Sequence, residues 1–444
     1  MRRNVIFVGI FAFSQSLYAA DLLQTFRDAR KHDAAYASAR SAYVASKERQ
    51  PQALALLLPT INANGNTAWN NSPIAFRNST VPGPFPRQYN TNSWAVTLTQ
   101  PLIRMQDWAQ YKQSEFQVAQ AAASFGQATQ GLIVRVAQAY FDVLASEDSL
   151  AFIQAQKFAI SEQLAQAKRN FEVGTANISD THEAQARYDL AVSQEIAAQN
   201  DLEIRQGALQ QITGIFPERI TPLSPSTQLE APQPNSMKQW MESSEKNSFP
   251  VQIQSAALEI ASREVQRARA AHLPTLDLFS SYGEGAAGVI QTSTANVGYD
   301  QHVSTVGVQL TVPLYAGGAV NSKVREALAN QDKAREDLEN ARRDSAQAAR
   351  QAYLGVTNGM AQVRALQQAL SSSQNSLDSN VFGYKLGVRI NIDVLNAQQQ
   401  LFSTKRDLSR ARYDTLVSGL RLKAAAGTLS EDDLAAVNRL FATD

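Results

Sequence analysis

The sequence contains one pattern associated with cofactor chemistry, a glycine motif that runs from Gly283 through Gly285 to Gly288. The motif has the GxGxxG spacing of a dinucleotide-binding loop and follows a predicted strand. A dinucleotide site also requires a helix directly after the glycines and an acidic residue about 20 residues further on. Residues 289–296 are polar and have no helical pattern. We therefore interpret the motif as a loop that binds no cofactor.

Other motifs of catalysis and metal binding are missing from the sequence. It holds no phosphate loop, nucleophile elbow or HExxH motif, and its four histidines have no metal-binding spacing. The lack of cysteine excludes disulfides, thiolate metal sites and lipid attachment at a cysteine. The acidic pair Asp432-Asp433 is typical of the first turn of a helix, where carboxylates are stabilised. The sequence therefore predicts a protein that is not an enzyme and that uses no cofactor or metal.

Two acidic residues that each follow a glycine reveal an internal repeat. The segment FEVGTANISDTHEAQ aligns without a gap with YKLGVRINIDVLNAQ, so that Gly174 matches Gly387 and Asp180 matches Asp393. We expect each glycine to end a helix in a left-handed backbone conformation. Asp180, or Ser179 before it, is expected to cap the helix that follows. The chain is therefore predicted to be two copies of one unit.

Helical and alternating patterns follow one another in the same order in both copies. The first repeat, 21–214, is predicted to hold a helix from Asp21 to about Leu58, a β-hairpin at 60–100, a long helix at 102–173 and a return helix at 179–213. The second repeat, 251–427, is predicted to hold a helix at 251–272, a β-hairpin at 275–312, a long helix at 315–386 and a return helix at 391–426. A proline-rich linker with a short helix, 215–250, joins the repeats, and a segment at 428–444 follows them.

The two long helices indicate an elongated, mainly helical fold. About 70 residues at a rise of 1.5 Å give roughly 105 Å of helix, which is far more than a globular core requires. Buried positions in the first long helix are predicted from apolar residues at helical spacing, namely Ile133, Val136, Tyr140, Phe141 and Leu144. The composition, with many Ala and Gln residues, is typical of coiled coils.

The first twenty residues, 1–20, predict a secretory signal peptide. Arg2 and Arg3 precede a short apolar run, and small residues follow, so that cleavage after Ala19 or Ala20 fits. The apolar run is much shorter than the roughly 20 residues of a membrane-spanning helix. We therefore expect an exported protein. Its net charge of +1 makes nucleic acid an unexpected partner.

The four predicted strands each have one apolar and one polar face, and Pro101 and Pro313 are expected to end the second strand of each hairpin. Trp69, Trp94 and Tyr282 lie near the ends of the apolar faces, as in the aromatic girdle of an outer-membrane barrel. A soluble β-sandwich would show the same alternation. Four strands cannot close a barrel, and lipid does not tolerate open sheet edges. We therefore expect several copies to share one barrel, and a trimer would supply about 12 strands.

Segments in both repeats resemble the TolC-like family of outer-membrane channel-tunnels. These are FEVGTANISDTHEAQARYD, YKLGVRINIDVLNAQQQL, the QQITG end at Gln210–Gly214 and LKAAAGTLSEDDL at Leu422–Leu434. The resemblance covers nearly all of the chain after the signal peptide. It implies a homotrimer in the outer membrane of a Gram-negative cell, with a 12-stranded β-barrel, a long α-helical barrel in the periplasm, and an equatorial part built from 215–250 and 428–444.

The resemblance further implies a passive exit duct for a tripartite efflux pump or a type I secretion system. A periplasmic adaptor and an inner-membrane pump, either ABC-type or proton-driven, would open its periplasmic end. The sequence features of a duct are the same for drug export and for protein export, so the sequence does not distinguish these two classes of cargo. The alternative is a periplasmic coiled-coil adaptor or scaffold. An adaptor should have one helical hairpin, whereas this chain has the hairpin pattern twice, with paired strands in each copy.

The resemblance also assigns roles at the periplasmic entrance. Asp393 matches an acid of the constriction, and three copies would form a carboxylate ring that attracts cations. Asn396 stands where the family has a second acid, which should weaken the field of this ring. The turns at Gly174 and Gly387 would face the adaptor.

Polar links that close the entrance are implied by the same resemblance. Asp180 matches an acid that bonds a tyrosine, here Tyr384. Ser179 matches a hydroxyl residue that faces an arginine, here Arg389. Such links would hold a closed state that the adaptor and pump open.

Overall fold

The computed structural model describes residues 21–73, 88–175, 177–217, 219–224, 227, 229–291 and 296–441. The predicted signal peptide, 1–20, lies outside the described residues, as does most of the loop inside the first hairpin. The chain divides into two compact units. One takes in the described parts of Met1–Arg40, Phe125–Val251 and Arg342–Asp444, and the other takes in those of Ser41–Ser124 and Gln252–Ala341.

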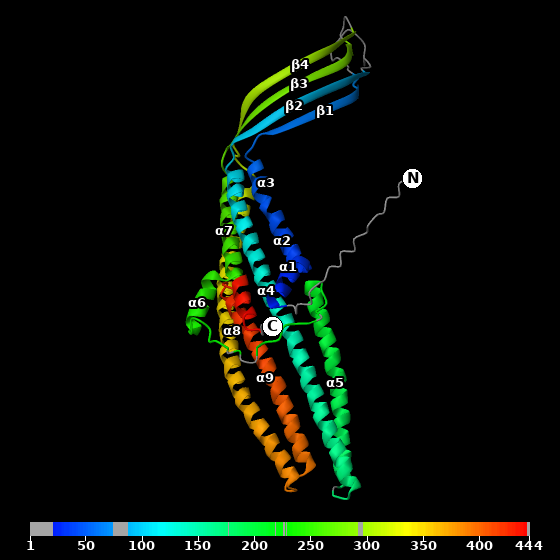
Figure 1. Cartoon of the computed structure of the whole chain (residues 1–444). Coiled ribbons are helices and arrows are strands. Elements are labelled where there is room, and N and C mark those ends of the chain that lie inside the picture. The colour runs from blue at the N-terminus through cyan, green and yellow to red at the C-terminus, as the bar shows by residue number, and fades with distance from the viewer. Residues whose placement is uncertain are drawn as a thin grey trace, which may run out of the picture. The chain divides into compact units, whose positions relative to one another are not determined.

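The described part of the chain is mainly helical, with one small sheet (Figure 1). The helices are α1 (Leu22–His32), α2 (Ala34–Lys47), α3 (Arg49–Ala55), α4 (Met105–Glu172), α5 (Ile178–Thr213), α6 (Met237–Asn247), α7 (Phe249–Ala270), α8 (Ala319–Lys385), α9 (Asn391–Ala425) and α10 (Glu431–Asn438). The strands are β1 (Thr60–Asn71), β2 (Gln88–Ile103), β3 (Thr275–Gln291) and β4 (Asn296–Thr311). A helical segment, two strands, a long helix and a return helix therefore follow in the same order twice.

The first helical stretch is divided, so the prediction of one helix from Asp21 to about Leu58 is wrong. Asp33 has an extended backbone, with φ −60° and ψ 115°, and ends α1. Its carboxylate accepts the Tyr36 backbone N–H at 2.6 Å and pairs with Arg135 at 3.0 Å. An acidic side chain that accepts a free N–H stabilises the start of a helix, so Asp33 favours a new helix over the continuation of α1. A second division, at Glu48, separates α2 from α3.

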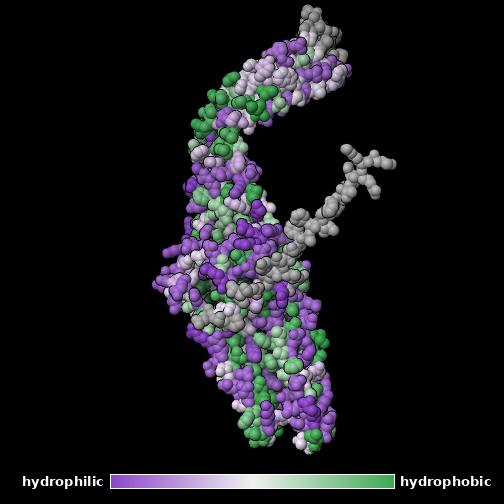
Figure 2. Space-filling model, in the orientation of Figure 1, coloured by the Kyte–Doolittle hydropathy of each residue, from purple (hydrophilic) through white to green (hydrophobic). Residues whose placement is uncertain are grey.

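The sheet is antiparallel with the order β1-β2-β3-β4. Its register places the predicted apolar positions on one face, because Val96 lies opposite both Ala63 and Tyr282. Ser280 lies opposite Val306 in the same way. Figure 2 shows hydrophobic side chains gathered on part of the sheet and hydrophilic ones on other parts. On β4, Val306, Val308 and Leu310 are exposed.

Two expectations about the strands are wrong. β2 continues past Pro101 to Ile103, with an irregular register at this point, because an irregular pairing tolerates the missing proline N–H. The glycine motif at Gly283–Gly288 is part of β3 and not a loop. A Cβ atom at Gly283 would lie 2.5 Å from the Trp94 carbonyl oxygen on β2, so the close approach of the two strands requires glycine here.

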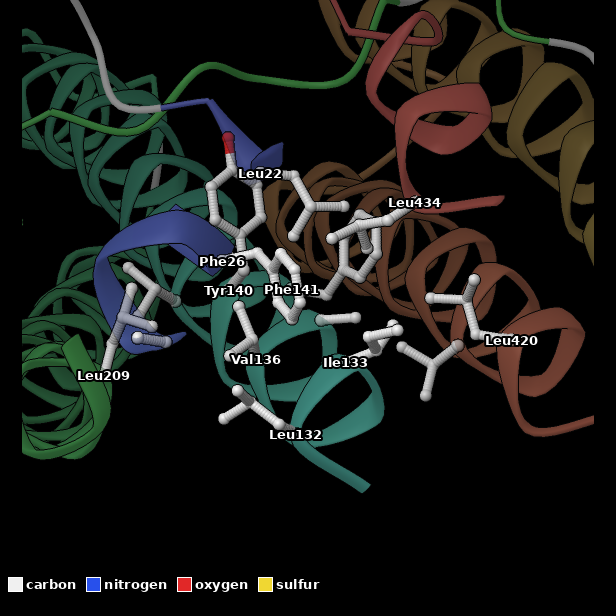
Figure 3. Close-up of a cluster of buried hydrophobic side chains, with 14 of the residues drawn as sticks. Leu22, Phe26, Leu132, Ile133, Val136, Tyr140, Phe141, Leu209, Leu420 and Leu434 are labelled. Atoms are coloured by element: carbon white, nitrogen blue, oxygen red, sulfur yellow. The ribbon is translucent and has the colours of Figure 1, made fainter. Parts of the chain in front are cut away.

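The main core surrounds the middle of α4. All five apolar positions predicted for this helix are buried, with Val136 and Tyr140 at 0% exposure. Figure 3 shows side chains from α1, α5, α9 and α10 around them. The Tyr140 hydroxyl donates to the Thr221 carbonyl oxygen at 3.0 Å, which satisfies its only donor inside the core. No helix in the described part of the chain is both apolar enough and long enough to cross a membrane.

Candidate functional site

The two helix turns predicted to face a partner have the same local geometry. Gly174 follows α4 with φ +77°, and Gly387 follows α8 with φ +75°. At each glycine, a Cβ atom would have no neighbour within 4 Å. Beside them, Val173 is 72% exposed and Val388 is 75% exposed. Each turn therefore presents an apolar side chain next to a glycine that has open space around it.

The helix that returns from the first turn, α5, has a different cap from the predicted one, whereas α9 begins at Asn391 as predicted. Asn177, and neither Ser179 nor Asp180, caps α5, and its side chain accepts the Ser179 backbone N–H at 3.2 Å. Asp180 lies three residues after Asn177, in the first turn of the helix. A carboxylate in this place is stabilised by the helix dipole without being the cap itself.

Asp393 also lies in the first turn of its helix, α9. One oxygen of its carboxylate, Oδ2, is 3.5 Å from the Ile390 backbone N–H and 3.7 Å from the Arg389 guanidinium. Arg389 is about half exposed, so water screens this ion pair. The Arg389 side chain thus lies beside the acid of the predicted ring within one chain.

Within the described residues of one chain, the closing links have other partners. The Asn170 side-chain amide donates to the Tyr384 hydroxyl oxygen at 3.2 Å, which connects the end of α4 to the end of α8. No hydrogen bond joins Tyr384 to Asp180, or Ser179 to Arg389, in this part of the chain. The predicted links between neighbouring coils therefore stay a prediction for the assembled protein.

Arg187 on α5 is a residue that the sequence analysis did not single out. Its Nη1 donates to Gln399 Oε1 at 2.7 Å, and its Nη2 donates to Asn396 Oδ1 at 3.2 Å, both on α9. Its Nε donates to Glu183 Oε1 at 3.1 Å, one turn earlier on its own helix. Only the spacing of Glu183 and Arg187 could be detected in the sequence, as a helical i, i+4 pair.

A thin apolar cluster lies between the same helices. Its buried members, which come from α4, α5 and α9, are Ile160, Leu164, Ala167, Ala184, Ala191 and Leu395. A small cavity of about 80 Å³ borders the cluster. It is lined by Gln156, Ile160, Arg187, Leu190, Ala191, Gln194, Leu395, Gln399, Ser403 and Arg406. The lining contains two arginines and no acid.

Several buried polar atoms near this cluster have no hydrogen-bond partner among the described residues. Both side-chain polar atoms of Asn391 are in this state, and the residue is only 1% exposed. Gln398 Oε1, Thr181 Oγ1 and Gln163 Oε1 are also buried and have no hydrogen-bond partner among the described residues. Buried polar groups without partners lower the stability of the packing around them.

The described residues contain no group of His, Cys, Asp or Glu side chains that could hold a metal ion. What they contain are paired helical hairpins with polar residues near their turns, and a sheet with an apolar face.

Comparison with known proteins assigns the class. The family model described as "Outer membrane efflux protein" matches residues 26–215 and 240–428, one match in each repeat. The chain belongs to the outer membrane efflux protein family.

Individual relatives cover nearly the whole chain. "Outer membrane protein TolC" of Escherichia coli (strain K12) is 32% identical over 98% of this chain and 87% of its own length. "Proteases secretion protein PrtF" of Dickeya chrysanthemi is 30% identical over 98% of this chain and 94% of its own length. The solved structure of the Campylobacter jejuni CmeC outer membrane channel has the same fold, with a TM-score of 0.78 and 16% identity over 94% of this chain and 89% of that chain.

Proposed function

We propose that three copies of this chain form an outer-membrane channel-tunnel, the passive exit duct of an efflux or type I secretion system. The observation that carries the proposal is the sheet. Part of one face of the sheet is apolar, with Val96, Val306 and Val308 exposed, and the edge strands β1 and β4 have no strand partner among the described residues. An apolar face suits lipid, and closure by further copies would pair the free edges. Three copies give about 12 strands, which lies within the range of known barrels.

The helices support the second part of the proposal. In each copy, α4 with α5 and α8 with α9 form two hairpins whose turns carry Gly174 and Gly387. Coiled hairpins from three copies could line a water-filled tunnel in the periplasm. The exposed Val173 and Val388 at the turns are suited to an apolar contact with a periplasmic adaptor, which an inner-membrane pump would accompany. Because the family assignment accounts for both repeats, the adaptor alternative is not supported.

The names of relatives bear on the cargo. PrtF is named for the secretion of proteases, and the matching family is described as outer membrane efflux proteins. Both small-molecule efflux and protein secretion therefore remain within the proposed function. In either case the duct contributes no chemical step, because it supplies a path and its pump supplies the energy.

Single-channel recording in a planar lipid bilayer tests the proposal. We expect a small, stable conductance with a preference for cations, and we expect Asp393→Ala to lower that preference. The reason is that three carboxylates in a narrow entrance attract cations. Conductance with unchanged ion selectivity in the mutant would support the duct but contradict the role of Asp393 in selectivity. A folded, membrane-inserted protein without conductance would contradict the duct itself.

A further inference from the structure

Arg187 and Asn396 form a contact that the ring interpretation of Asn396 does not include. The Asn396 side-chain oxygen accepts a hydrogen bond from Arg187, and Gln399 accepts a second one, so two residues of α9 are bound by one residue of α5. Asn396 and Gln399 are three positions apart and therefore lie on the same face of their helix. The guanidinium group meets both because its donors are arranged as a planar fork.

This contact lies where the two helices are otherwise weakly joined. The buried cluster beneath it contains three alanines, and Leu395 is its only member on α9. The Asn391 amide and Gln398 Oε1, also on α9, are buried without partners among the described residues. When α9 separates from α5, water can bind these amides, which offsets part of the lost apolar contact. The polar contact of Arg187 therefore weighs heavily in the balance between the joined and separated states.

We propose that Arg187 is the clamp that holds α9 against α5 in the closed entrance, with Asn396 and Gln399 as its acceptors on α9. The proposal rests on the function proposed above, since only a channel has an entrance to close. Asp393 then remains the one acid of the ring in each chain.

The amide at position 396 sets the strength of the clamp. Arg187 already has a carboxylate partner, Glu183, on its own helix, at 3.1 Å. Its bonds to α9 go to two neutral oxygens, and neutral acceptors bind a guanidinium more weakly than a carboxylate does. An acid at position 396 would form a charge-assisted bond across the two helices and hold the entrance shut more firmly. Asn396 thus gives a clamp that a partner can release.

Five variants test the clamp in the full-length protein by single-channel recording with measurement of the K⁺/Cl⁻ permeability ratio. They are R187A, R187K, N396D, the double variant R187A/N396D and the control R406A. Arg406 lines the same cavity but makes no ion pair or hydrogen bond among the described residues, so its loss removes a similar charge without the clamp. Trimer yield and melting temperature are measured for each variant, so that a folding defect is recognised separately.

If Arg187 is the clamp, R187A should raise the open fraction, the fraction of time that a channel is open, about tenfold. A change of this size is expected when a two-state element loses one charge-assisted contact. R187K should lie between R187A and wild type, because a lysine cannot reach both acceptors in the same fork. R406A should match wild type. N396D should lower the open fraction, because a carboxylate binds the guanidinium more strongly than the amide does. R187A/N396D should lose this effect and resemble R187A, because the partner of the new carboxylate is gone.

Other outcomes would overturn the inference. If N396D raises cation preference and leaves the open fraction unchanged, position 396 acts in the ring and not in the clamp. If R187A and R406A change the open fraction equally, general charge near the entrance is responsible and not the clamp. A wild-type protein that forms no channel would contradict the proposed function, and this result is distinct from a channel that ignores the loss of Arg187.

Discussion

Two glycines with nearly the same backbone angle should respond very differently to alanine. Gly427 follows α9 with φ +73°, and Gly174 follows α4 with φ +77°. A Cβ atom at Gly427 would overlap the Asn247 carbonyl oxygen and lie 2.8 Å from the Asn247 carbonyl carbon. At Gly174 the same atom would meet nothing within 4 Å. The pair therefore separates the cost of the backbone angle from the cost of the overlap.

The expected magnitudes follow from these two terms. Placing alanine in the left-handed region costs about 1–2 kcal/mol, which is the whole expected effect of Gly174→Ala. At Gly427 the overlap is with backbone atoms that cannot rotate away, and overpacking of this kind adds about 1–3 kcal/mol. We therefore expect Gly427→Ala to lower the free energy of unfolding by about 2–5 kcal/mol for each chain.

Thermal unfolding followed by circular dichroism at one scan rate measures the difference between the variants. Gly174→Ala should lower the melting temperature by a few degrees and leave trimer yield unchanged. Gly427→Ala should lower both clearly. Gly387→Ala, with φ +75° and open space, is the matched control and should behave as Gly174→Ala does. Equal shifts at Gly427 and Gly174 would refute the argument, because they would mean that the backbone near Asn247 relaxes freely.

Two further substitutions test charged groups. Burial, and secondly the charge of Asp148, raises the pKa of Glu147 above its ordinary value. The stability linked to this shift is fully present below about pH 4.5 and is lost as the pH rises. Glu147→Gln should thus raise the melting temperature at pH 7 but not at pH 4, and an equal rise at both would count against the shift. Arg104 binds both carboxylate oxygens of Asp277 at 2.8 Å beside the irregular pairing of β2 and β3. Arg263 on α7 donates to Gln266 and forms no ion pair among the described residues, so it serves as the control. Arg104→Ala should lower trimer yield more than Arg263→Ala, and equal yields would argue against a role for the Arg104–Asp277 pair.

The sequence predicted the features that depend on local pattern. The turns at Gly174 and Gly387, the apolar face of the sheet and the core positions of α4 all follow from glycine conformation and from periods of 3.6 and 2 residues. Each of these signals lies within a few neighbouring residues. These features can therefore be predicted without knowing which contacts the rest of the chain makes.

The errors arose where a distant contact overrides a local preference. Gly283 in isolation favours a loop, but β2 lies against it so closely that only glycine fits in the strand. Pro101 normally ends a strand, yet the irregular pairing beside Asp277 lets β2 continue. The contact of Arg187 with Asn396 joins residues that are 209 positions apart, so it depends on how two helices pack and has no local signal.

The central pairing of the sheet has a consequence for how the protein is made. β2 ends at Ile103, and its partner β3 begins only at Thr275, so the two middle strands belong to opposite repeats. Contacts between such distant segments form slowly, since a long loop must close first. Until Thr275–Gln291 has been synthesised, the hairpin of β1 and β2 carries an apolar face and an unpaired edge, which favour aggregation. We therefore expect biogenesis to need a holding chaperone during this interval, and the demand should end when the second repeat arrives.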